Sequence, residues 1–276
     1  GVSGGFVTTP LLIFYGIPAG VAVATQASPV AAAALVGTLR QSSRQSVDVK
    51  MGLVLLCGGL AGSAAGVVIF LYLQKLGQTD LVVETSYVLL LGGVGGLMLR
   101  ESARALLAAR RGVAPPSTMQ RRHTWIHNLP FKTRFRRSGL YISVRPIIVL
   151  GFLVGIMTAI LGTGGAFLLI PAKIYLLRMR TNLAVGTSQF QMFIVASVTT
   201  LMHALTDHTV DIMLAFLLIA GGVIGAQYGA ALGARLRGEQ LRVIFALLIL
   251  AIALRLAFGL VVSPQDVYSV FLSPPA

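Results

Sequence analysis

Two stretches of the chain repeat a glycine cluster followed by a proline, and backbone anion binding is the chemistry that such clusters support. GVSGGFVTTP covers residues 1–10 and GTGGAFLLIP covers residues 162–171, with every interval between glycine, phenylalanine and proline conserved. Glycine lets an anion approach the backbone closely, and the N–H groups that open a helix carry the positive end of its dipole. We therefore predict that each cluster opens a helix whose N-terminus binds an anion; tight helix crossing is the alternative role of these glycines.

Polar side chains that suit the same chemistry follow each cluster. AVATQ and AVGTSQ, residues 22–26 and 184–189, open the next predicted helices, where their hydroxyls and amides either ligate an anion or coupling cation or cap the helix. Lys173 is the only lysine or arginine between residues 146 and 177, so it is the candidate cation of the site. Ser3 either offers a hydroxyl to substrate or caps its helix. The candidate substrate-binding residues are Ser3, Gly4, Gly5, Thr25, Gln26, Gly162, Thr163, Gly164, Gly165, Lys173, Thr187, Ser188 and Gln189.

Other ionisable residues have both structural and functional interpretations. Asp48 and Asp211 occupy equivalent helix starts, where a carboxylate either complements the helix dipole or carries a proton. Arg255 interrupts an apolar run and either snorkels to the outer surface or balances an anion. Residues 203–211 contain two histidines and two aspartates, yet they lie in an expected external loop without a recognised ligand spacing. We predict no metal site and no cofactor.

The composition is that of a membrane protein. Of the 276 residues, 56% are hydrophobic and only 11% are charged, against about a quarter charged in a typical soluble domain. Uncharged runs long enough to cross the bilayer are residues 51–73, 146–172, 181–202 and 212–234; shorter or interrupted runs are residues 22–39, 85–99 and 243–262. The runs have no period of two, so we predict helices rather than barrel strands. The single cysteine, Cys57, excludes an intramolecular disulfide.

The net charge of +14 is concentrated in one connecting segment. Residues 108–145 carry nine arginines and lysines and no acidic residue. This is the positive-inside pattern of a cytoplasmic loop between spans, so the charge does not indicate nucleic-acid binding.

The two sides of this loop are related in sequence. AVATQ lies over AVGTS, and VDVKMGLVLLCGGLAGSAAG, residues 47–66, lies over VDIMLAFLLIAGGVIGAQYG, residues 210–229. The connection that is basic in one half is acidic or neutral in the other, so the positive-inside rule predicts inverted repeats over residues 1–107 and 146–276. The glycines spaced by four within the matched helices are predicted to form close-packing faces: Gly58, Gly62, Gly66, Gly221, Gly225, Gly229 and Gly233.

Inversion requires an odd number of crossings in each half, which implies that the glycine cluster at 162–165 breaks the run at 146–178 at membrane depth. Backbone groups freed there must face protein or a wet cavity. The predicted fold is an all-α integral membrane protein, a polytopic helical bundle of two inverted-topology repeats with glycine-broken helices. Because an apolar run precedes the second cluster but not the first, we expect a further span before Gly1.

The motif GTGGAFLLIPAKIY, followed by AVGTSQF and then by VD and a glycine-spaced helix, resembles the TauE/SafE sulfite exporter family of permeases. The resemblance covers nearly the whole chain. It implies an integral membrane permease for small sulfur-containing anions such as sulfite, sulfonates or sulfoacetate. Ser3 departs from the usual glycine run of the first copy, and Thr163 and Ala166 depart from that of the second.

The sequence therefore predicts a transporter that moves a small anion by alternating access at two inverted half-helix sites, in a cell membrane that is expected to be a bacterial inner membrane. An anion channel of the same fold is the main alternative. An intramembrane enzyme is disfavoured, because no acid and base lie at close spacing within the spans. The expected partners are a small anionic substrate, the lipid bilayer and a coupling ion, H⁺ or Na⁺, with a homo-oligomer left open.

Overall fold

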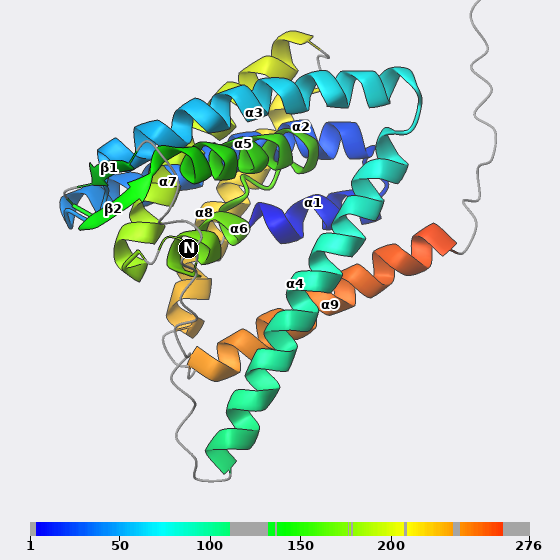
Figure 1. The fold of residues 1–276 in the computed structure, drawn as a ribbon. Helices are drawn as coiled ribbons and strands as arrows, with labels where there is room; N and C mark the ends of the chain where they lie inside the picture. The colour runs from blue at the N-terminus through cyan, green and yellow to red at the C-terminus, as the bar shows by residue number, and fades with distance from the viewer. Residues whose placement is uncertain are drawn as a thin grey trace, which may run out of the picture.

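The computed structural model describes residues 4–110, 132–135, 137–175, 177, 179–206, 209–233 and 238–261, which form helices and one short hairpin (Figure 1). Ser3 lies outside the described residues, as do Asp207 and His208. The elements are α1 (Gly5–Phe14), α2 (Ala19–Ser43), α3 (Val49–Lys75), α4 (Thr79–Arg110), β1 (Lys132–Phe135), β2 (Leu140–Ser143), α5 (Val144–Leu161), α6 (Ala166–Tyr175), α7 (Thr181–Thr206), α8 (Ile212–Gly233) and α9 (Gly238–Val261).

Five of the described helices are long and apolar enough to cross a membrane: α2, α3, α4, α5 and α9. The prediction of a polytopic α-helical membrane protein is confirmed. Two helices are longer than the apolar runs that predicted them, since α2 and α4 continue through polar residues at their ends. The single run predicted over residues 146–172 is divided between α5 and the ten-residue α6.

Glycines bring α3 and α5 into backbone contact. A Cβ at Gly58 or Gly62 of α3 would collide with the carbonyl oxygen of Ile148 or Phe152 in α5. Gly155 makes the equivalent contact from α5, because its Cβ would collide with the Gly59 carbonyl of α3. The predicted close-packing role is therefore confirmed for the glycines of α3.

Among the described residues, the predicted contact is absent at three glycines of α8. At Gly221, Gly225 and Gly229 an added Cβ would meet no described atom within 4 Å, and all three glycines are exposed. Small residues spaced by four allow a second helix to come close, but they do not ensure that a second helix is there.

A second layer is formed by α4 and α9, which cross one another beside α1 (Figure 1). Tyr87 of α4 is fully buried in the core that these helices share with Phe6 and Phe70. Its hydroxyl donates a hydrogen bond to the carbonyl of Leu161, the last residue of α5. The tyrosine thus satisfies a carbonyl that the end of α5 leaves without a helical donor.

The strands β1 and β2 form an antiparallel hairpin within the predicted basic loop, with Lys132 paired to Ser143 and Phe135 to Leu140. Strands of four residues are too short to span a bilayer. Ile142 of β2 is buried together with Leu169 of α6 and Leu177. The hairpin therefore covers one end of the bundle, which we call the hairpin end.

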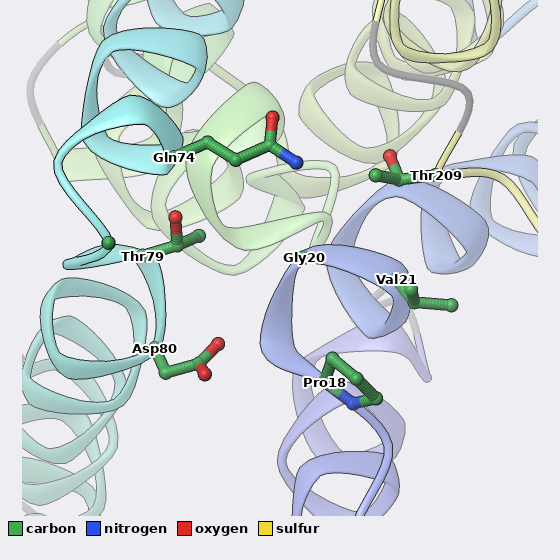
Figure 2. Close-up of a pocket in the computed structure, with 8 residues that line it drawn as sticks. Pro18, Gly20, Val21, Gln74, Thr79, Asp80 and Thr209 are labelled. Carbon is green, nitrogen blue, oxygen red and sulfur yellow. The ribbon is translucent and has the colours of Figure 1, made fainter. Parts of the chain in front are cut away.

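The opposite end is formed by the connections before α2, α4 and α8. The Ala19 N–H donates to Asp80 Oδ1 at 3.2 Å, which joins the start of α2 to that of α4. Asp80, Pro18 and Thr209 line an open pocket between these connections (Figure 2), and we call this end the pocket end.

Candidate functional site

The N-termini of the two short helices α1 and α6 both contact Val30 of α2. A Cβ built on Gly5 would lie 2.7 Å from Val30 Cγ2, and one built on Gly164 would lie 2.5 Å from Val30 Cγ1. Two positive helix ends that are far apart in the sequence therefore meet at one side chain. The candidate site is the region around Val30.

The second glycine cluster has a backbone that only glycine adopts easily. Gly162, Gly164 and Gly165 have φ values of 66°, 71° and 63°. The space around them is also closed, because Cβ atoms at Gly164 and Gly165 would lie 2.5 Å from Val30 Cγ1 and Val154 Cγ1, respectively. Conformation and packing alone thus require glycine here. The identity of these residues is not independent support for an anion site.

The first cluster differs at Gly4, the N-cap of α1. Its φ is −59°, and an added Cβ would meet no described atom within 4 Å. Packing against the described residues and backbone strain do not require a glycine at this exposed N-cap. Glycine is a common N-cap residue, and it would also permit close approach by a ligand.

Each short helix begins with backbone donors that have no intrahelical acceptor. The first helical hydrogen bonds run to the Gly4 carbonyl from Val7 and Thr8, and to the Gly165 carbonyl from Leu168 and Leu169. The N–H groups before these donors have no acceptor within their own helix. At α6 this turn includes the buried residues Gly164 and Gly165.

Lys173 contributes a buried cation to the α6 side of the site. Its side chain is 0% exposed, and Nζ donates a hydrogen bond to Ser188 Oγ at 3.0 Å. Ser188 and Met192 lie one turn apart on the same face of α7, and the Met192 Cε atom is 2.8 Å from the Cβ position of Gly164. Lys173 itself lies in the last turn of α6, and its ammonium is held against α7 at Ser188.

Gln26 is the counterpart of Ser188 in the first half. Its Nε2 atom is 3.2 Å from the Cβ position of Gly5, so the amide lies beside the start of α1. The side chain is buried, and Oε1 accepts no hydrogen bond from any described residue. A buried amide oxygen without a partner is uncommon in native proteins.

Three predicted residues lie elsewhere. Thr25 and Thr187 accept hydrogen bonds from the backbone N–H groups of Asp211 and Asp48, each at 3.0 Å. Gln189 packs against Gly37, which is about three turns along α2 from Gln26. Thr163 is fully buried between the glycines of the second cluster. The structure thus gathers Gly5, Gln26, Gly162, Gly164, Gly165, Lys173 and Ser188, and it gives Thr25, Thr187 and Gln189 other surroundings.

The ionisable residues outside the site have structural contacts. Asp48 Oδ1 and Asp211 Oδ1 accept from the N–H groups of Met51 and Leu214, which is the helix-start role considered for both. The Arg255 guanidinium lies 4.6 Å above the ring centroid of Phe14, at the C-terminal end of α1. Arg255 is therefore remote from the helix N-termini.

The prediction that His203 lies in an external loop is wrong. His203 belongs to α7 and is 0% exposed. Its Nε2 atom is 3.1 Å from the Ala159 carbonyl, and its ring packs edge-on against Phe70. The helix continues further than the charge pattern indicated, because packing against α3 and α5 stabilises its last turns.

Sequence reasoning missed Val30 and Met192, the apolar residues that join the two helix starts. Both lie four residues after a polar residue of the repeated segment, Val30 after Gln26 and Met192 after Ser188. The helical spacing of four places each pair on one face. This spacing of four residues could have identified Val30 and Met192 from the sequence.

The chain matches the family model described as Sulfite exporter TauE/SafE over residues 1–256. It is 25% identical over 267 residues to "Probable membrane transporter protein YunE" of Bacillus subtilis (strain 168), covering 94% of this chain and 91% of that protein. It is 28% identical over 258 residues to a "Probable membrane transporter protein" of Xylella fastidiosa (strain 9a5c), covering 92% of this chain and 87% of the relative. No solved structure matches significantly. The chain belongs to the TauE/SafE sulfite exporter family of membrane proteins, and its similarity to these relatives supports a membrane transporter.

Proposed function

We propose that the protein is a permease for a small sulfur-containing anion, of the sulfite, sulfonate or sulfoacetate type, and that the anion binds where α1 and α6 begin. The observation that carries the proposal is the meeting of both helix starts at Val30, with the buried Lys173 further along α6. The sulfur chemistry of the substrate is taken from the family description.

Electrostatics favour an anion at this position. Each helix start contributes about half a positive charge, and the Lys173 ammonium contributes a full one. An ammonium has three donors, and among the described residues only Ser188 accepts one of them. The buried Asp48 carboxylate partly balances this charge, and an anion with several oxygen acceptors would satisfy the remaining ammonium donors.

The arrangement of the connections supports inverted repeats and alternating access. The connection before α3 lies at the hairpin end, whereas its sequence counterpart before α8 lies at the pocket end. Helix breaks at the centre of two oppositely oriented halves are the usual construction of secondary transporters. The arginines of the hairpin segment indicate that the hairpin end is cytoplasmic.

Ligand-induced thermal stabilisation of the purified protein tests the proposal. Sulfite and small sulfonates should raise the melting temperature of the parent protein, whereas Lys173→Met should remove most of that rise while the variant remains folded. Lys75→Met, which alters an exposed lysine at the end of α3, is the matched control and should respond like the parent. A full ligand response in Lys173→Met would contradict the proposed site.

A further inference from the structure

The β1–β2 hairpin is fastened to the bundle by a buried carboxylate. Asp48 is 2% exposed, and its Oδ2 atom accepts hydrogen bonds from the N–H and hydroxyl of Ser138, at 3.0 Å and 2.5 Å. Arg137 of the same turn donates from Nη1 to the Val47 carbonyl at 2.9 Å. The turn of the hairpin is thus bound to the connection between α2 and α3.

The contact between Asp48 and Ser138 lies next to the residues that hold Lys173. The Asp48 N–H donates to Thr187, and the next residue, Ser188, holds Lys173. Thr187, Ser188 and Lys173 are all 0% exposed. The hairpin turn and the buried Lys173 are therefore connected through Asp48, Thr187 and Ser188.

Among the described residues, the corresponding aspartate of the second half has no such cover. Asp211 repeats two contacts of Asp48, because its N–H donates to Thr25 and its Oδ1 accepts from Leu214. Asp211 is nevertheless exposed, and no described residue outside α8 donates to its carboxylate. The hairpin is the element that distinguishes the two ends.

We propose that the β1–β2 hairpin is a gate over the Lys173 side of the transport path, and that the contacts of Ser138 and Arg137 with the α2–α3 connection hold it shut. The gate has a purpose only if the protein transports the proposed anion, so this inference rests on the proposed function. Opening breaks the bonds to Ser138 and Arg137 but leaves the bond from Met51 to Asp48 intact. The carboxylate therefore keeps its position and can bind the turn again.

A single reporter cysteine measures the opening. Ser188→Cys is introduced in a Cys57→Ala background, and its labelling rate by a membrane-impermeant thiol reagent is measured on purified protein without substrate. Adding Ser138→Ala, alone or with Arg137→Ala, removes hairpin contacts while sparing the helix cap made by Asp48. Loss of a hydrogen bond to a charged group should raise the labelling rate roughly tenfold or more.

Asp211→Asn is the matched control, since it changes the equivalent residue at the end without the hairpin, and it should leave the labelling rate unchanged. A thermal melt confirms that each variant is folded at the labelling temperature. Labelling at the parent rate in folded Ser138→Ala and in the double variant overturns the gate. An equal increase in Asp211→Asn also overturns it, because general loosening would then explain the result.

The outcome is separable from that of the proposed function. Labelling requires no substrate, so hairpin opening is measured even if no anion stabilises the protein. Normal ligand-induced stabilisation together with unchanged labelling would contradict the gate but not the proposed permease. Absence of any ligand response in the parent protein removes the permease, whatever the hairpin does.

Discussion

The side chain of Thr25 accepts a hydrogen bond from the backbone N–H of Asp211 at 3.0 Å, and Thr187 accepts one from Asp48 at the same distance. Each threonine belongs to one copy of the repeated segment, and each aspartate begins the equivalent helix of the other half. The two contacts therefore join the halves reciprocally. They give both threonines a structural role, and the substrate contact predicted for them stays a prediction.

Replacing these threonines should affect stability rather than ligand binding. Thr25→Val and Thr187→Val preserve side-chain shape but leave a backbone N–H without its acceptor, which costs about 1 to 3 kcal/mol where the donor is buried. Thermal unfolding in detergent should show the larger loss for Thr187→Val, because Asp48 is buried and Asp211 is exposed. Loss of the sulfite response at unchanged stability would restore a substrate role.

The sequence predicted the helices well, because apolar runs report directly on local structure. It was less informative where structure depends on a partner. The matching spacings of Gly58 and Gly221 predict the same packing, but of these two glycines only Gly58 has a described helix against it. His203 lies among polar residues in sequence, yet contacts with Ala159 and Phe70 keep it in α7.

Alanine substitution of one glycine in α3 and of one in α8 should have different effects on stability. Gly62→Ala places a methyl group against the Phe152 carbonyl of α5, so α3 and α5 must move apart or strain, at a cost of about 1 to 3 kcal/mol. Gly225→Ala meets open space and gains helix propensity, so stability should be unchanged or rise by up to about 1 kcal/mol. Melting temperatures of the purified variants test this contrast, and a destabilised Gly225→Ala would show that α8 has a partner in the membrane.

His203 should be a packing residue without a metal. His203→Leu removes the contact with the Ala159 carbonyl and should lower stability by about 1 to 3 kcal/mol. A chelator should leave the melting temperature of the parent protein unchanged. If the chelator reproduces the effect of His203→Leu, the histidine belongs to a metal site after all.

The two ends of the bundle should face opposite sides of the membrane. Gln45 is exposed beside the hairpin end, and Thr206 is exposed at the C-terminal end of α7 toward the pocket end. Single cysteines at these positions, in a Cys57→Ala background, should react with an impermeant thiol reagent from opposite sides, with Gln45→Cys labelled from the cytoplasm. Reaction of both from one side would refute the orientation drawn from the loop charges.

Gly4 should decide whether the glycine clusters serve the ligand or only the packing. At Gly165 the test is confounded, because the positive φ and the contact with Val154 make Gly165→Val unstable for reasons unrelated to an anion. Gly4 has an ordinary φ and open space around its Cβ position, so Gly4→Val should cost about 1 kcal/mol of stability or less. If the first N–H groups of α1 hold the anion, the valine side chain would block its approach, and losing one donor to a charged group should weaken binding roughly tenfold or more. Gly96→Val, at another uncrowded glycine within α4, controls for the added bulk. The measurement is the sulfite concentration that gives half of the maximal thermal shift. An unchanged value in Gly4→Val would mean that the anion does not bind at the start of α1, and the glycine clusters would then be architectural.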